Sequence, residues 1–167
     1  MSQHDAIKGR HTSLRRAVES DLDLLARWFA DPDVYAWWGG KPIPRDKVSA
    51  DFTGHRRPEV ESFIVETEAS PIGYLQYWHA TDRSGGIDMF LVPEARGRGL
   101  GPDAARTAAE FLLREQGWLE VTVDPLTDNE RAIRAFARAG FVAEREDRDE
   151  ETGKPCLIMA MRRSESS

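Results

Sequence analysis

The stretch GIDMFLVPEARGRGLG, residues 86–101, sets a carboxylate, an apolar run and a glycine-rich loop side by side. The apolar residues after Asp88 predict a buried strand, and the amphipathic stretch 102–117 predicts a helix that ends at Gly117. Glycines let a backbone turn sharply and approach a ligand closely. The free N–H groups of such a loop and of a helix N-terminus attract anions. This unit therefore indicates an anion site, with diphosphate as its natural ligand.

Two common phosphate-binding motifs do not account for this loop. A nucleoside-triphosphate loop carries Gly-Lys followed by Ser or Thr, and a dinucleotide fingerprint reads G-x-G-x-x-G, whereas this loop reads GRGLG. An ordinary tight turn between strand and helix needs one glycine, and residues 97–101 contain three. Arg96 and Arg98 add positive charge. We therefore favour an anion site of another kind.

Strand and helix patterns alternate along the rest of the chain. Period-two and apolar patterns predict strands at 12–18, 61–68, 72–80, 86–92, 119–125, 141–150 and 155–161. Amphipathic patterns with capping residues predict helices at 19–34, 45–55, 102–117 and 129–140. Residues 36–44, with two glycines and two prolines, predict a loop. This alternation implies a mixed α/β sheet with helices on both faces.

Length and composition predict a single domain. The 167 residues suffice for one domain with a sizeable core, between a flexible leader at 1–11 and a flexible tail at 164–167. The formal net charge of −6 argues against nucleic acid as a partner; it suits a protein that attracts cations, or one that is merely kept soluble. Without a long apolar run or a signal peptide, and with Cys156 alone, we expect no membrane partner and a cytoplasmic location.

Two motifs resemble those of the GCN5-related N-acetyltransferase (GNAT) family. The spacing Arg96-x-x-Gly99-x-Gly101 resembles the acetyl-CoA loop of that family. The stretch DNERAIRAFARAGF, residues 128–141, resembles its second cofactor motif, in which Asn-x-x-Ala precedes an aromatic residue and Gly-Phe. The resemblance covers residues 12–162. It implies a domain at 12–163 with a mostly antiparallel central sheet, a splayed pair of parallel strands, and acetyl-CoA as cosubstrate without a metal.

A narrower resemblance is to the aminoglycoside 6'-N-acetyltransferases. The shared words, in the same order, are WWGG (37–40), PIGYLQYW (71–78), GID (86–88) and the stretch 124–141. This resemblance implies that a small cationic amine is acetylated, with antibiotic resistance as the consequence. Because the segment 81–85 is short, the 6'-amine and a 2'-amine of an aminoglycoside both stay open. The oligomeric state, monomer or homodimer, also stays open.

The resemblance implies a set of cofactor residues. The pantetheine arm would pair with a strand backbone, as in β-augmentation, and the diphosphate would lie on the loop. The implied cofactor-binding residues are Met89, Phe90, Leu91, Gly97, Arg98, Gly99, Leu100, Gly101, Asn129 and Phe136. Asn129 is also a candidate helix N-cap. A backbone N–H near Leu91 would bind the oxyanion.

The resemblance also implies Asp88 and Asp124 as the candidate catalytic residues, because family members carry acidic residues at the matching positions. An unperturbed Asp has a pKa of about 3.9, far below that of a sugar ammonium. We therefore expect these aspartates first to hold the cationic substrate, and to pass on its proton only after the site has raised their pKa. The expected substrate-binding residues are Trp38, Gln76, Asp82, Asp88 and Asp124. The acidic run 144–151 is expected to be a solvated hairpin tip or an aid in steering a polycation.

Phe136 departs from the family pattern. Many members have a tyrosine there, to which protonation of the leaving thiolate is assigned, and phenylalanine cannot donate a proton. A thiolate is nevertheless a tolerable leaving group. Two alternatives therefore remain: a protein or peptide N-acetyltransferase of the ribosomal-protein type, which the helix pattern at 20–34 also resembles, and a non-catalytic acyl-CoA-binding domain.

Overall fold

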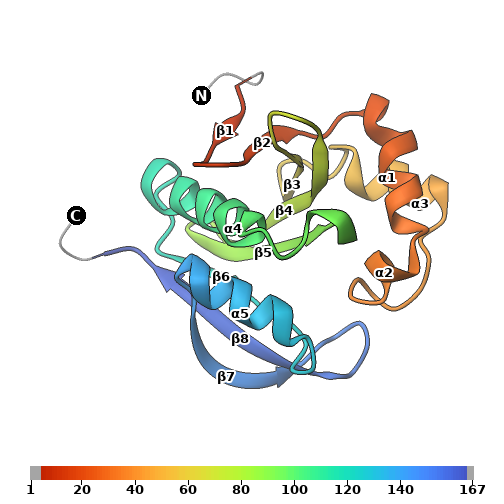
Figure 1. Cartoon of the computed structure of the whole chain (residues 1–167). Coiled ribbons are helices and arrows are strands. Elements are labelled where there is room, and N and C mark those ends of the chain that lie inside the picture. Colours follow the sequence, from red (N-terminus) through yellow and green to blue (C-terminus); the bar gives the residue numbers. More distant parts are fainter. Residues whose placement is uncertain (1–4, 165–167) are drawn as a thin grey trace.

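The computed structural model, which describes residues 5–164, is built on one eight-stranded sheet (Figure 1). The strand order is β1-β2-β3-β4-β5-β6-β8-β7, and β5–β6 is the one parallel pair among the described strands. The strands are β1 (Ile7–Lys8), β2 (Ser13–Arg16), β3 (Val60–Glu66), β4 (Pro71–Thr81), β5 (Ser84–Leu91), β6 (Glu120–Val123), β7 (Val142–Arg148) and β8 (Pro155–Arg162). The predicted mixed, mostly antiparallel sheet is confirmed.

The helices differ from the predicted ones mainly at the first helix. They are η1 (Glu19–Asp21), α1 (Leu22–Phe29), α2 (Pro32–Tyr35), α3 (Arg45–Phe52), η2 (Pro93–Ala95), α4 (Leu100–Glu110), its π-helical continuation η3 (Phe111–Glu115), and α5 (Glu130–Ala139). The single helix expected at 19–34 is interrupted because Asp31, which precedes Pro32, is extended. The Asp31 carboxylate then caps α2 by accepting from the Asp33 N–H at 2.9 Å.

Helices cover both faces of the sheet, as expected. On one face, Tyr74 and Phe90 of neighbouring strands meet Phe29 of α1, which stacks on Phe52 of α3 at 4.4 Å between ring centroids. On the other face, Leu91 meets α4, which lies across the sheet in Figure 1. Side chains of β5 therefore alternate between two apolar layers, and any polar residue in this strand is enclosed by them.

The parallel strands β5 and β6 separate after a short paired segment. Their pairing covers only Ser84–Gly86 of β5, and Gly86 opposite Thr122 is its last pair. Beyond Val123 the chain follows β8, because the Pro125 carbonyl accepts from the Leu157 N–H at 2.8 Å and Leu126 bridges to Cys156. The strands β6, β8 and β7 thus turn away from β5, and a gap opens between β5 and β6.

Part of the expected leader, residues 1–11, pairs with the sheet. Residues 1–4 lie outside the described residues, but β1 pairs with β2 and Ile7 is buried. Asp103 of α4 anchors the following turn: it accepts from the backbone N–H groups of Arg10, His11 and Thr12 and from the Thr12 hydroxyl. Partial burial opposes ionisation, yet these hydrogen bonds prevail and lower the pKa of Asp103. In the expected tail, residues 165–167 lie outside the described residues.

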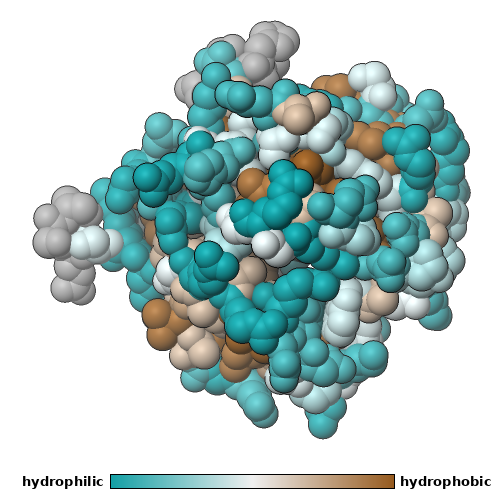
Figure 2. All heavy atoms as spheres, viewed as in Figure 1, coloured by the Kyte–Doolittle hydropathy of each residue, from teal (hydrophilic) through white to brown (hydrophobic). Residues whose placement is uncertain are grey.

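Much of the surface in view is hydrophilic, and its apolar residues lie in separate patches (Figure 2). The exposed large apolar side chains Val18, Trp37, Leu119 and Val142 belong to different parts of the fold. Within residues 5–164, no helix is both long and apolar enough to cross a bilayer.

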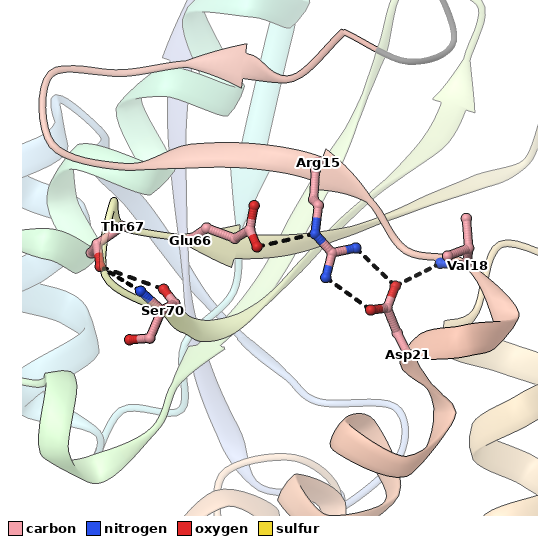
Figure 3. A network of polar contacts seen from close by, with 6 residues as sticks. All are labelled: Arg15, Val18, Asp21, Glu66, Thr67 and Ser70. Atoms are coloured by element: carbon pink, nitrogen blue, oxygen red, sulfur yellow. Dashed lines mark hydrogen bonds and ion pairs between the residues drawn. The ribbon is translucent and has the colours of Figure 1, made fainter.

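An ion-pair network fixes the entry into α1 (Figure 3). The buried carboxylate of Asp21 accepts from both terminal nitrogens of Arg15, at 2.8 and 3.0 Å, and from the Val18 N–H at 2.9 Å. Arg15 also donates to Glu66 of β3 at 3.1 Å. Two-pronged binding of this kind is directional, so it holds η1 and α1 against the edge of the sheet.

We predict that Asp21→Ala lowers the free energy of unfolding by about 3 kcal/mol, because it leaves a partly buried guanidinium without its partner. Urea unfolding measures this loss. Asp23→Ala is the matched control: Asp23 forms an exposed ion pair with Arg45 and is expected to matter little. Equal losses in the two variants would contradict the anchoring role of Asp21.

Candidate active site

The glycine loop, residues 97–101, has the left-handed backbone turns that its composition suggests. Gly97 and Gly99 both have φ of +76°, in the left-handed region that favours glycine. Gly101 does not have a left-handed φ. Its missing side chain serves to leave space beside the loop. The guanidinium of Arg96 holds the loop in place by donating to the carbonyls of Leu91, at 3.1 Å, and Asp33, at 2.9 Å. Backbone N–H groups of the loop are thus presented at the start of α4.

A cavity of about 350 Å³ lies between this loop, β5 and α5. Its lining includes Met89, Phe90, Leu91, Gly97, Gly99, Gly101, Asn129 and Phe136, all of them expected cofactor residues. Among the other expected residues, Arg98 is exposed and Leu100 is buried in the core, and neither belongs to the lining. Leu100, being buried, can act there only through its backbone.

Three lining arginines of α5 were not predicted. Arg131, Arg134 and Arg138 join Arg96 in the cavity wall. Their spacing of three and four residues, which puts side chains on one helix face, was a readable signal. Burial, and then the nearby charge of Arg131, lowers the pKa of Arg96. The cavity therefore concentrates positive charge beside the glycine loop and suits a strongly anionic ligand.

The backbone of β5 has hydrogen-bonding groups directed into the gap beside β6. The Val92 N–H donates to Ile72 on the β4 side, at 2.9 Å. Because backbone groups alternate in direction along a strand, Met89 and Leu91 point away from β4 and toward the gap. Phe90 points its backbone toward β4. Of the three residues expected to meet the cofactor backbone, two are therefore placed for it.

Asn129 and Phe136 both face the cavity from the second motif. The Asn129 side chain caps α5 by accepting from the Ala132 N–H at 3.3 Å and also lines the cavity, so the two expected roles are compatible. Phe136 packs edge to face on Phe141 at 5.7 Å between ring centroids. None of the described lining residues is a tyrosine. The wall thus offers no phenol to a leaving group.

Asp88 and Asp124 flank the mouth of the gap. The last paired residues are Gly86 and Thr122, so two further steps along each strand reach Asp88 and Asp124. Had the strands stayed paired, these two residues would be direct neighbours. Their charges interact: burial first, and then the charge of Asp88, raises the pKa of Asp124 to about 7. The structure therefore brings the two expected catalytic carboxylates together.

The environment of Asp88 also opposes ionisation. Burial raises the pKa of Asp88, while hydrogen bonds from Gln76 and Trp78 lower it in part. Gln76 donates to Asp88 at 3.1 Å and is itself buried. Asp149 and Glu151, in the β7–β8 connection, add further negative charge near Asp88. The tip of the acidic run is thus close enough to act on the site, which favours the steering role over that of a distant solvated tip.

Two expected substrate residues are placed differently from Asp88 and Asp124. Trp38 packs edge to face on Tyr74 and Phe90, at 5.7 and 5.8 Å between ring centroids, so it anchors the WWGG loop on the sheet. Asp82 lies in the turn between β4 and β5, at the end where Arg83 binds the Gly117 carbonyl. At about 3.3 Å per residue, the four residues from Ser84 to Asp88 alone span ~13 Å. The structure does not bring Asp82 to the other carboxylates.

This arrangement suits transfer of an acyl group to an amine. An elongated anionic donor can lie along β5 with its phosphates at the loop and its reactive end at the carboxylates. The carboxylates can hold a cation, and the Leu91 backbone offers a polar group at the gap. The loop and the gap thus border one cavity, and the two carboxylates lie outside its lining, two residues beyond the last β5–β6 pair.

Comparison with known proteins agrees with this geometry. The family model described as an acetyltransferase (GNAT) domain matches residues 17–148. The chain is 31% identical over 148 residues to aminoglycoside N(6')-acetyltransferase type 1 of Klebsiella pneumoniae, covering 77% of this chain and 73% of that protein. It is 32% identical over 146 residues to the N5-hydroxyornithine acetylase sidL of Beauveria bassiana, covering 78% of this chain and 26% of that protein.

Among solved structures, AAC(6')-Ib in complex with parmomycin and acetyl-CoA is similar, with a TM-score of 0.83. Its sequence identity to this chain is 27%, and the match covers 92% of this chain and 94% of that one.

We predict that Gly99→Ala weakens coenzyme A binding about tenfold, because alanine at this φ costs roughly 1–2 kcal/mol and displaces the loop amides. Titration calorimetry with coenzyme A measures the effect. Gly117→Ala is the control: its φ of +72° is equally left-handed and it also has open space around it, but it lies at the end of η3. An equal loss of affinity in both variants would show that the loop amides do not hold the ligand.

Proposed function

The chain belongs to the GNAT family of N-acetyltransferases, and from this we propose that it transfers the acetyl group of acetyl-CoA to the 6'-amine of an aminoglycoside antibiotic, which confers resistance. The observation that carries the acceptor class is the pair Asp88 and Asp124 at the mouth of the gap, joined by the charges of Asp149 and Glu151. A polycationic amine is the natural complement of four carboxylates. The relatives named above make the aminoglycoside the preferred polycation.

The chain supplies position and charge for the reaction. Acetyl-CoA brings the acetyl group as a thioester. The glycine loop and the arginines of α5 hold its phosphates, and the gap-facing backbone of Met89 and Leu91 aligns its arm. The neutral amine nitrogen forms the new bond to the carbonyl carbon, the carbon–sulfur bond breaks, and sulfur leaves with the electron pair, while the nitrogen gives its extra proton to solvent. The Leu91 N–H stabilises the carbonyl oxygen as its charge develops.

The two aspartates have different roles toward the acceptor: Asp88 binds an ammonium and Asp124 accepts a proton. Asp88 is held by Gln76 and Trp78 and fixes one ammonium of the substrate. Asp124 lies at the mouth and has a pKa of about 7, so it accepts the proton of the reacting amine directly or through water. Because no tyrosine lines the described cavity, the leaving thiolate takes its proton from solvent. A thiolate leaves readily enough for this, since a thiol titrates near 8.5.

The decisive experiment measures thiol release from acetyl-CoA with a panel of amines. Neomycin and paromomycin form a matched pair, because they differ in carrying an amine or a hydroxyl at 6'. We expect turnover with neomycin and little with paromomycin, and a raised inhibitory concentration of neomycin for bacteria that express the gene. Equal turnover of both compounds would favour another position, such as the 2'-amine. Turnover only with peptides or N-hydroxyornithine would refute the aminoglycoside, and tight binding without turnover would indicate a non-catalytic acyl-CoA-binding domain.

We predict that kcat/KM for the aminoglycoside rises with pH through a step near 7. Below this pH Asp124 is protonated and uncharged, so it neither holds the ammonium nor accepts its proton. Asp124→Asn should lower kcat/KM at pH 8 at least tenfold and remove the step, leaving only the rise due to the substrate amine. Asp128→Asn makes the same change of charge nearby and should keep the step. Persistence of the step in Asp124→Asn would assign it to another group.

A further inference from the structure

A polar row crosses the sheet inside an apolar face. Ser62 of β3 lies directly opposite Gln76 of β4, which lies directly opposite Asp88 of β5. The adjacent row on the same face is Ile64, Tyr74 and Phe90. Ser62 is 2%, Tyr74 0% and Gln76 7% exposed. Because buried polar groups are costly unless they are paired, each of these groups needs a defined partner.

Their partners form one chain of hydrogen bonds that ends on Asp88. The Ser62 and Tyr74 hydroxyl oxygens lie 2.8 Å apart, the Tyr74 hydroxyl donates to Gln76 Oε1 at 2.8 Å, and Gln76 Nε2 donates to Asp88 Oδ2 at 3.1 Å. Since the Tyr74 proton is directed to Gln76, Ser62 is the donor to Tyr74. Burial raises the pKa of Tyr74, so the phenol stays protonated and remains a donor.

We propose that Tyr74 is a positioning residue of the acetyl transfer, which acts through Gln76 to hold the Asp88 carboxylate toward the cationic acceptor. This inference rests on the function proposed above. It also changes the expected role of Gln76. Each end of its amide has a partner in the protein, so Gln76 supports Asp88 in addition to any contact with the substrate.

The physical reason is that a Gln side-chain amide has a hydrogen-bond donor at one end and an acceptor at the other. A Gln side chain can present either its NH2 group or its carbonyl oxygen to a neighbour. The NH2 group attracts the Asp88 carboxylate, whereas the carbonyl oxygen repels it. By occupying Gln76 Oε1, Tyr74 locks the side chain with Nε2 directed at Asp88. Without the phenol, Gln76 loses this restraint and Asp88 loses a fixed donor.

Negatively charged groups around Asp88 make the hydrogen bond from Gln76 more important for its carboxylate. The carboxylates that face Asp88 are Asp124 at the end of β6 and Asp149 and Glu151 in the β7–β8 connection, and all three disfavour its ionised form. The second donor to Asp88 is the indole of Trp78. This indole lies over Gly86, where an added Cβ would be 2.4 Å from the ring. Two hydrogen-bond donors thus stabilise the Asp88 carboxylate against three nearby negative charges. The remaining donor does not replace one that is lost.

The test is a double-mutant cycle of Tyr74→Phe and Gln76→Leu, with kcat and KM measured separately for acetyl-CoA and for the acceptor. We expect each single variant to lower kcat/KM for the acceptor roughly tenfold, the usual worth of a hydrogen bond to a charged group. The affinity for coenzyme A should not change. Because Tyr74 acts through Gln76, Tyr74→Phe should have little further effect in the Gln76→Leu background.

Tyr77→Phe is the matched control. Tyr77 is also buried, at 6% exposure, but it packs on Phe63 and Trp118 on the opposite face, and among the described residues its hydroxyl has no hydrogen-bond partner. This variant should keep wild-type kcat/KM. Equal rates for the two phenylalanine variants, or additive losses in the cycle, would overturn the inference.

A measurement without acceptor separates this inference from the proposed function. Carbon-13 titration of the Asp88 carboxyl in the free protein should show a higher pKa in Tyr74→Phe and Gln76→Leu than in Tyr77→Phe, because the carboxylate has lost its donor. If the wild type acetylates no aminoglycoside but these shifts are observed, the proposed function fails and the role of Tyr74 stands. If aminoglycosides are acetylated and the shifts are missing, the role of Tyr74 fails alone.

Discussion

The end of the β5–β6 pairing at Gly86 and Thr122 is the constraint on which the site depends. Beyond this pair, β6 continues along β8 through Pro125 and Leu126, so the backbone of β5 faces a gap instead of a partner strand. Backbone groups that a closed sheet would satisfy internally become available to a ligand. The glycine loop at the end of β5 then adds further free N–H groups to the same cleft.

The two carboxylates at this gap also lower the stability of the fold, because their like charges lie near each other. Asp88 and Asp124 would be adjacent in a closed sheet, and even across the gap their interaction helps to raise the pKa of Asp124 to about 7, well above its ordinary 3.8. The stability that this carboxyl contributes is therefore fully present below about pH 4 and is lost as the pH rises to 7. A cation bound between the carboxylates would reverse the effect.

The sequence predicted those parts of the site that depend on neighbours along the chain. The glycine loop and the cap at Asn129 come from local patterns, because turns and caps involve a few consecutive residues, whereas the stretch 89–91 was implied only by the resemblance to the GNAT family. The arginines of α5 were missed although their helical spacing was visible. The role of Gln76 and the remote position of Asp82 could not be predicted, because each depends on how β3, β4 and β5 are aligned side by side.

By itself, the sequence determined most of the strands and helices, the mixed sheet and the glycine loop, since these follow from hydrophobic period and from glycine and proline positions, and its resemblance to a family pointed to the two candidate carboxylates. Only the tertiary structure decided which polar groups meet. It placed Asp88 opposite Gln76, brought Asp124 to the same mouth, and held Arg10, His11 and Thr12 on Asp103. The reason is that strand register and the separation of β5 from β6 arise from contacts between segments far apart in the chain.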